Sequence, residues 1–396
     1  MSLLFFAGFD NFGGGLQGGT GYGQEFPAKG AGIVGTPYEA LLPITYGNAG
    51  ALYNSMGVPN DDRWRIGAGS QRRNMLIAAC GGSTSSYFAM AQVGPTFTQR
   101  PTSSYWSMTL GLNLCDFSAA VPAGGFYSIR VRRAAATLGY LCEHTASSTD
   151  QWRLGGNSPQ LSITRGQPVY LEFVIDTVNP ATSGTVQLRC RVYVNGELYH
   201  TNNAWASLTA SATNYDYAFE VGYDRVLTAD RRLGFSDIYV LDHLGEAPFN
   251  ERLGPQLVLP YKPTAVDPKD FSIVGGTDPL VVVNDGNDAT YLNSQVGRSA
   301  MSFDTDLSLP PGSQVNAVAA FAKIKRDDGA PRSFSALGAR VDGTPLGNTP
   351  ITASASASAR FALAHQYLPK SETERKALDF SDSGKMRINL TSEQPV

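Results

Sequence analysis

Between about residue 70 and residue 242, the chain consists of short apolar or alternating runs that are separated by clusters of Gly, Pro, Asn and Ser. Runs of this length, bounded by turn formers, are typical of β-strands, and nothing comparable in this region has the period of a long amphipathic helix. The chain's 42 glycines and 23 prolines agree with a turn-rich fold. The sequence therefore predicts an all-β protein. The best strand candidates are residues 75–80, 87–93, 104–112, 126–131, 168–176, 186–194 and 235–241.

Two of these runs predict how their strands face. In residues 170–176 and 186–194 the polar side chains recur at every second position, which predicts one face in the core and one in water. The second run ends at Asn195-Gly196, a dipeptide typical of two-residue hairpins, and resumes as residues 197–200. Ten or more short strands at this spacing favour a two-sheet sandwich of the jelly-roll type.

The composition divides the chain into three parts. A jelly-roll domain covers residues 1–246 and includes a Gly-rich N-terminal arm at 1–35. This arm is either a first strand with ordered loops or a segment that packs on a neighbouring subunit. Residues 247–268 form a stiff extended connector, because their five prolines are incompatible with the interior of a helix or a central strand. A second, smaller β-rich domain covers residues 269–396 and has a frayed C-terminus.

Local signals predict the elements of the second domain. Residues 280–283, followed by Asn284-Asp-Gly286, predict a hairpin, and residues 314–325 and 333–341 predict strands. The alternating Ala and Ser of residues 353–359 favour another strand, while Ser371 with Glu374 predicts a short capped helix.

Charge and hydropathy exclude several classes of protein. There are 31 Lys and Arg against 34 Asp and Glu, a net charge of −3, which excludes the basic surplus of nucleic-acid-binding proteins. No apolar run approaches the roughly 20 residues that span a bilayer, so no membrane insertion is expected. The first six residues lack the basic start of a signal peptide, which predicts an uncleaved protein made in the cytoplasm. The four widely spaced cysteines predict buried free thiols.

Catalytic and metal-binding patterns are weak. The four histidines lie in separate strands or loops and outside known catalytic motifs. The acidic pairs Glu172 with Asp176 and Asp216 with Glu220 would suit a glycosidase, but such stripes are also the outward face of any half-exposed strand. Oxygen-rich residues at 284–288 and 304–306 suggest calcium, although turns explain them better. Arg132-Arg133 is interpreted as a solvated strand end. We therefore predict no catalytic residue, no metal and no cofactor.

Aromatic side chains provide the one predicted contact surface. Trp205 stands in a loop-like run, and Tyr215 and Tyr217 follow it in the chain. Flat rings of this kind can cover the face of a sugar, so these three residues are the predicted contacts for a glycan or a protein partner. Trp106, within an apolar strand, is predicted to lie in the core.

Several short motifs resemble those of bacteriophage virion structural proteins with a concanavalin or laminin-G-like jelly roll. Those in the first domain are Gly8-Phe-Asp-Asn-Phe-Gly13, Arg72-Arg73, Val192-Tyr-Val-Asn-Gly196 and Gly234-Phe-Ser-Asp-Ile-Tyr-Val-Leu-Asp242. Those that follow are Gly245, Asn250, Leu253-Gly254, Val283-Asn-Asp285 and Thr290-Tyr291. The resemblance implies a component of a tail, baseplate, neck or capsid surface, and it identifies no catalytic residue.

Together these observations lead to one expected function and two alternatives. We expect a non-enzymatic virion structural protein, most readily of the tail, that assembles with copies of itself and with other virion proteins. The first alternative is a carbohydrate-binding module that recognises a glycan of the host surface, or a capsid decoration protein. The second is a glycosidase or depolymerase.

Overall fold

The structure is a computed structural model, and it divides the chain into two compact units, with the chain passing from the first to the second between Val258 and Leu259. This division falls inside the proline-rich segment. The residues that the structure describes are 3–7, 64–68, 74–80, 89–98, 106–116, 125–134, 136–145, 151–178, 184–209, 216–224, 231–242, 244–259, 261–284, 289–294, 299–307, 309, 313–324, 333–340, 342–347, 351–354, 360–380 and 384–393.

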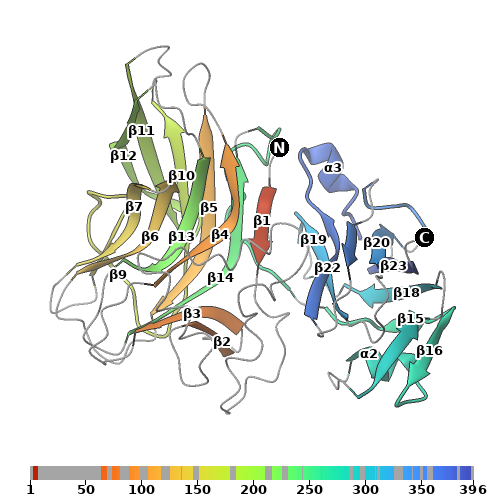
Figure 1. Ribbon diagram of the computed structural model, residues 1–396. Coiled ribbons are helices and arrows are strands. Elements are labelled where there is room, and N and C mark those ends of the chain that lie inside the picture. Colours follow the sequence, from red (N-terminus) through yellow and green to blue (C-terminus); the bar gives the residue numbers. More distant parts are fainter. Residues whose placement is uncertain are drawn as a thin grey trace. The chain divides into compact units, whose positions relative to one another are not determined.

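The first unit is a concanavalin-like jelly-roll sandwich of two antiparallel sheets, as the strand pattern predicts (Figure 1). The eight-stranded sheet has the order β12-β11-β10-β5-β14-β3-β2, and β1 also pairs with β14. Its strands are β1 (Leu3–Ala7), β2 (Trp64–Ala68), β3 (Asn74–Cys80), β5 (Ser107–Asp116), β10 (Val169–Thr177), β11 (Thr185–Val194), β12 (Glu197–Thr209) and β14 (Arg231–Asp242).

The six-stranded sheet has the order β4-β13-β6-β7-β8-β9. Its strands are β4 (Ala89–Thr98), β6 (Phe126–Arg133), β7 (Ala136–His144), β8 (Gln151–Leu154), β9 (Leu161–Ser162) and β13 (Asp216–Tyr223). The predicted hairpin at Asn195-Gly196 is confirmed, since it joins β11 to β12 and both residues have positive φ angles of 51° and 90°.

Aromatic side chains fill the core of the sandwich. Trp106 is fully buried, as predicted, and its ring centroid lies 5.1 Å from that of Tyr217 on the other sheet. Elsewhere in the core, Phe126 stacks on His144 and meets Trp152 edge-on. The side chains that make these contacts point into the core. The side chains at alternate positions of the same strands therefore point outward.

One prediction about facing is wrong for β10. Its polar residues Glu172 and Asp176 lie on the outer face of the sheet but are fully buried rather than exposed to water. Arginines and a crossing segment of chain cover them, as described below.

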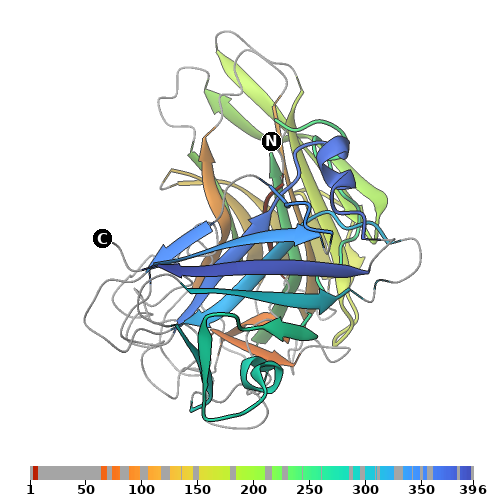
Figure 2. The same ribbon diagram turned by 90° about the vertical axis from the view of Figure 1, so that its right-hand side faces the viewer.

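The second unit is also β-rich. Its five-stranded sheet has the order β15-β18-β23-β20-β21, and Figure 2 shows several of its strands side by side. These strands are β15 (Ala265–Asp267), β18 (Ser299–Asp306), β20 (Ser333–Arg340), β21 (Ile351–Ser354) and β23 (Lys385–Glu393). Two further pairs are β16 (Phe271–Val274) with β17 (Tyr291–Ser294) and β19 (Val318–Ile324) with β22 (Arg360–Tyr367).

Two local predictions in this unit have opposite outcomes. The capped helix is confirmed: α3 (Glu372–Lys376) begins after Ser371, whose hydroxyl accepts the Glu374 N–H. The hairpin at residues 280–283 is wrong, because α2 (Pro279–Asn284) occupies this stretch. Asp278 caps that helix by accepting the Leu280 N–H at 2.8 Å, and Pro279 suits its first turn.

Three further predictions concern the C-terminus, the Ala-Ser segment and the Gly-rich arm. β23 continues to Glu393, paired with β18 and β20, where a frayed end was expected. β21 contains the first residues of the Ala-Ser segment, and residues 355–359 lie outside the described part of the chain. The Gly-rich arm, apart from Leu3–Ala7 in β1, also lies outside it.

Candidate functional site

The three predicted contact residues do not form a site. Trp205 lies on β12 rather than in a loop, and its indole N–H donates to the Tyr140 carbonyl at 2.9 Å. Its ring lies against Gly139, where a Cβ atom would come within 2.6 Å of it. Trp205 therefore joins the edge of one sheet to β7 of the other. Tyr217 is fully buried in the core, which excludes it from a contact surface, and Tyr215 lies outside the described residues.

The acidic side chains of β10 are held by arginines. Asp176 accepts two hydrogen bonds from Arg189, both 2.8 Å long, and a third of 2.8 Å from Arg191. Because a buried carboxyl group is costly unless it is paired, these arginines compensate for the burial of Asp176 in the sheet. The pair Glu172 and Asp176 is therefore committed to structural ion pairs rather than set opposite each other across an open cleft.

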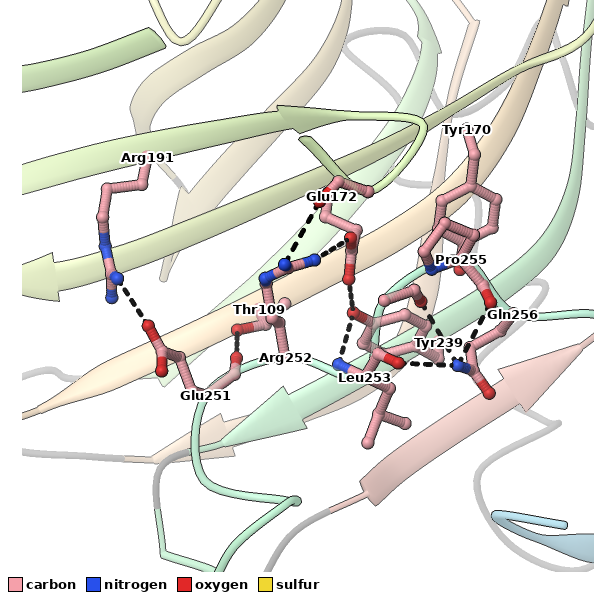
Figure 3. A network of polar contacts seen from close by, with 12 residues as sticks. Thr109, Tyr170, Glu172, Arg191, Tyr239, Glu251, Arg252, Leu253, Pro255 and Gln256 are labelled. Carbon is pink, nitrogen blue, oxygen red and sulfur yellow. Dashed lines mark hydrogen bonds and ion pairs between the residues drawn. The ribbon is translucent and has the colours of Figure 1, made fainter. Parts of the chain in front are cut away.

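Glu172 anchors the segment that leaves the jelly roll. This segment, residues 249–258, crosses the outer face of the eight-stranded sheet (Figure 3). Arg252 donates to Glu172 at 2.8 Å and to the Gly196 carbonyl at 3.2 Å, and its guanidinium lies 4.0 Å from the centre of the Tyr193 ring. An ion pair with a fully buried carboxylate thus fixes the segment at its middle.

Tyr239 completes this anchor from a third strand. Its hydroxyl donates to Glu172 and accepts the Leu253 N–H at 3.1 Å. Burial, followed by the charge of Glu172, raises the pKa of Tyr239 well above its usual value, so the phenol keeps the proton that it donates. To reach β10 from β14, the ring passes over β5 at Gly111, where a Cβ atom would stand 2.1 Å from the ring.

A bulge in β14 supplies the second anchor. The register with β5 shifts between Ser236 and Tyr239, and Asp237 there has a positive φ of 48°. Its carboxylate accepts from the Asn113 side chain at 2.7 Å and from the Val258 N–H at 2.8 Å. We call Glu172, Tyr239, Asp237 and Arg252 the connector clamp. The clamp pairs each of these buried carboxylates within the fold.

The outer face of the six-stranded sheet carries a different cluster. Glu220 on β13 is fully buried and lies beneath two arginines of β6: Arg130 Nε is 2.5 Å and Arg132 Nε is 3.2 Å from its carboxylate oxygens. The arginine side chains are 15% and 20% exposed, so both reach the surface. One carboxylate thus holds two positively charged groups in place.

Two tyrosines adjoin these arginines. Tyr140 on β7 is the cross-strand partner of Arg130, and its ring stacks on Tyr127 with the centroids 3.9 Å apart. Both rings are half-buried, and the exposed Thr137 accepts a hydrogen bond from Arg130 at 3.3 Å. We call Arg130, Arg132, Glu220, Tyr127 and Tyr140 the arginine–tyrosine face.

The sequence indicates two members of this face but not their association. Arg132 belongs to a basic pair that predicts a solvated strand end, and Glu220 to an acidic pair with Asp216. The available signal was the alternation in Tyr127-Ser-Ile-Arg-Val-Arg132, which places both arginines on one side of a strand. The register with β13 and β7, which brings in Glu220 and Tyr140, has no signal in the sequence.

The remaining predictions from the sequence concern calcium, the cysteines and membrane insertion. Asp304 of the suggested calcium segment pairs with Arg387 at 2.6 Å, and residues 285–288 lie outside the described residues. Within the described part of the chain, no group of three His, Cys, Asp or Glu side chains could hold a metal ion. The free thiols of Cys115, Cys142 and Cys190 are buried, as predicted. Nor does any helix in the described ranges have the length and apolar character needed to cross a membrane.

Comparisons with known proteins find solved structures with a similar sandwich but identify no family for this chain. No family model matches this chain, and no curated protein does. Among solved structures, alginate lyase Aly36B is 10% identical, with a TM-score of 0.36 over 60% of this chain and 96% of that one. Alginate lyase AlgAT5 of Polysaccharide Lyase family 7 is 12% identical, with a TM-score of 0.32 over 46% of this chain and 83% of that one. A Trypanosoma rangeli sialidase is 14% identical, with a TM-score of 0.29 over 48% of this chain and 27% of that one.

These comparisons correct one expectation. The prediction that the chain is not an enzyme is wrong as stated, because proteins with a similar sandwich are named as lyases and sialidases. The architecture gives no ground for excluding catalysis. At these identities and TM-scores the likeness extends to the β-sandwich alone, and it assigns no reaction, substrate or residue to this chain.

Proposed function

We propose that this protein is a structural component of a bacteriophage particle, located in the tail or its appendages and assembled from copies of itself with other virion proteins. The proposal concerns the chain's place in a particle and leaves open whether it also carries an activity. A baseplate, neck or capsid-surface position would satisfy the same motifs, so the experiment below distinguishes these positions.

The observation that carries the proposal is the role of the motif residues. Asp237 and Tyr239 belong to the strand motif that resembles phage virion proteins, and both hold residues 249–258 on the sheet. Leu253, part of the second motif, is one of the residues held. The motif residues therefore fix the segment that connects the jelly roll to the second β-rich unit. A common role for these residues in this chain and in phage virion proteins supports the proposal.

A connecting segment that is fixed on the sheet suits a component of a particle for a mechanical reason. Buried ion pairs and hydrogen bonds resist local opening because breaking one leaves an unpaired buried charge. A segment held in this way keeps its path when the units on either side bind neighbours. Repeated copies in a symmetric assembly need such reproducible geometry, since each interface must recur identically.

The test is to locate the chain in intact particles. Antibodies raised against the purified protein should label density-gradient-purified virions at the tail, and the chain should be present there in a constant ratio to the major capsid protein. Labelling at the neck or capsid surface would replace the tail assignment. Absence of the chain from purified particles that contain the capsid protein would refute the structural role.

A further inference from the structure

We propose that the connector clamp opens reversibly under tension: when the chain is pulled from the side of the second unit, residues 250–258 lift off the sheet and lengthen the connection while the sandwich stays folded. Without a load the clamp holds the segment in place. The inference concerns the isolated protein and goes beyond its proposed place in a particle, so either proposal can fail without the other.

The first argument is the order in which the anchors bear a load. The Val258 N–H, the Leu253 N–H and the Arg252 guanidinium are bound to the sheet separately, at successive points along the segment. Figure 3 shows the second and third of these anchors. Tension that enters at Val258 reaches the next anchor in full only after the one before it has yielded. The anchors therefore open one after another rather than together.

The second argument is the small burial of apolar side chains in the segment. Leu257 is 53% exposed, and Pro255 is exposed as well. Polar contacts hold the segment, and water replaces these contacts when the segment lifts. In β14, by contrast, Phe235 and Val240 are fully buried, and the strand pairs with β5 on one side and with β3 and β1 on the other. Extracting β14 exposes apolar surface to water, so the segment opens first.

Phe249 limits how far the chain opens. Its side chain is fully buried, and its N–H donates to the Glu246 carbonyl at 2.7 Å. Exposing a large aromatic side chain costs more than exchanging a hydrogen bond for one to water. Residues 250–258 can therefore come free before this anchor yields, and in extended form they span at most about 30 Å.

The opening is reversible because the binding groups on the sheet remain in place. Glu172 and Tyr239 belong to β10 and β14, and each of these strands is paired on both sides within the eight-stranded sheet. The hydrogen bond between these two side chains does not involve the segment. Arg252 therefore meets the same carboxylate again when the tension falls.

Optical tweezers test the proposal on the full chain. Handles are attached through Gln167→Cys and Lys262→Cys in a Cys80→Ala background, while the thiols of the other three native cysteines are buried. Gln167 is exposed before β10, and Lys262 is exposed after the segment, so the load passes through the connector clamp. The chain should lengthen by at most about 30 Å at a force below that which unfolds the sandwich. It should shorten again when the force is lowered.

Three variants should change this step. Arg252→Leu should raise the population of the lengthened state at a given force about a hundredfold or more, because only the clamped state loses an ion pair and water solvates Glu172 once the segment has lifted. Tyr239→Phe should raise this population about tenfold or more, since it removes both hydrogen bonds of the phenol. Phe249→Ala should lengthen the step to at most about 50 Å, the reach of residues 243–258.

Arg340→Leu is the control. It removes an arginine of the second unit, outside the loaded part of the chain, and should leave the force and the length of the step unchanged. Tyr239→Phe keeps the ring and provides the test if Arg252→Leu fails to fold. Unfolding of the sandwich without a preceding step, a first step that does not reverse, or the same force for the step in the wild-type protein and in a folded clamp variant would each overturn the proposal.

Discussion

Replacing Gly111 by alanine should destabilise the first unit, because the ring of Tyr239 occupies the space that a side chain would need. A Cβ atom at position 111 would lie 2.1, 2.6 and 2.7 Å from three carbons of that ring. Carbon atoms in contact are normally about 3.5–4.0 Å apart, so the ring must move by more than 1 Å. The ring cannot move freely, because its hydroxyl is bonded to Glu172 and to the Leu253 N–H.

The expected loss combines two costs and one gain. Overpacking of this kind costs about 1–3 kcal/mol. If the ring moves away, the hydrogen bond to the buried carboxylate of Glu172 is lost as well, which costs about 1.5–3 kcal/mol. Alanine in a strand regains about 0.5–1 kcal/mol relative to glycine. The net loss for Gly111→Ala is therefore about 2–5 kcal/mol, a large part of the 5–15 kcal/mol that is typical of whole domains.

Urea denaturation followed by tryptophan fluorescence measures this loss. All four tryptophans, at positions 64, 106, 152 and 205, precede the boundary at Val258, so the signal reports on the first unit. Tyr239→Ala provides the matched background: with the ring gone, Gly111→Ala should cost nothing or stabilise slightly. Tyr239→Phe keeps the ring but has no hydroxyl hydrogen bond left to lose, so Gly111→Ala should retain only the overpacking part of the penalty in that background, about 1–3 kcal/mol before the gain from alanine. An equal loss from Gly111→Ala in the wild-type and Tyr239→Ala backgrounds would refute the packing argument.

Three further predictions concern individual groups. Arg252→Leu should destabilise the first unit by about 3–5 kcal/mol, because a buried carboxylate loses its partner, and chymotrypsin should then cut within residues 249–258. Cys142 and Cys190 should resist iodoacetamide at pH 8 in the native protein, since burial raises the pKa of Cys142 to about 12 and also raises that of Cys190. Asp304→Asn should make the second unit less dependent on pH: hydrogen bonding to Arg387 lowers the pKa of Asp304, so its contribution to stability is present above pH of about 4 and is lost as the pH falls through the lowered pKa.

Each of the three has a control. Arg340→Leu removes an arginine whose ion pair is long, 4.0 Å, and should leave cleavage at residues 249–258 unchanged. Both thiols should react after unfolding in urea, and reaction of either at the native rate of a free thiol would contradict its burial. Asp306→Asn removes an exposed pair with Lys385 and should change the acid sensitivity little, as followed by far-ultraviolet circular dichroism. An equal effect of the Asp304 and Asp306 substitutions would contradict the role of Arg387.

The strands and the hairpin of the jelly roll were predictable because their signals are local. Alternation marks β11, and Asn195-Gly196 provides the positive φ angles that a tight hairpin turn needs. The run of valines at 281–283 misled because β-branched residues favour strands, whereas the cap at Asp278 and the proline after it favour a helix start. In that stretch the capping signal outweighed intrinsic propensity.

The burial of charge was not predictable, since it depends on contacts distant in sequence. Glu172 is 80 residues from Arg252 and 67 from Tyr239, and Glu220 is 90 from Arg130. Period-two alternation predicts that such acids face away from the core, and they do. It gives no information on whether another segment or a neighbouring strand's arginines then cover that outer face.

The two outer faces of the sandwich use the same chemistry to different ends. On the eight-stranded sheet, Glu172 binds an arginine delivered by the chain itself, and the clamp turns this face into a support for the segment that leads to the second unit. On the six-stranded sheet, Glu220 binds two arginines of the adjacent strand, and both side chains still reach the surface. The difference lies in where the arginine comes from: Arg252 is delivered by a segment that follows the last strand of the sandwich, whereas Arg130 and Arg132 belong to a strand of the same sheet. Alternation along a strand therefore predicts that such an acid points outward, and the course of the rest of the chain decides which partner it meets there.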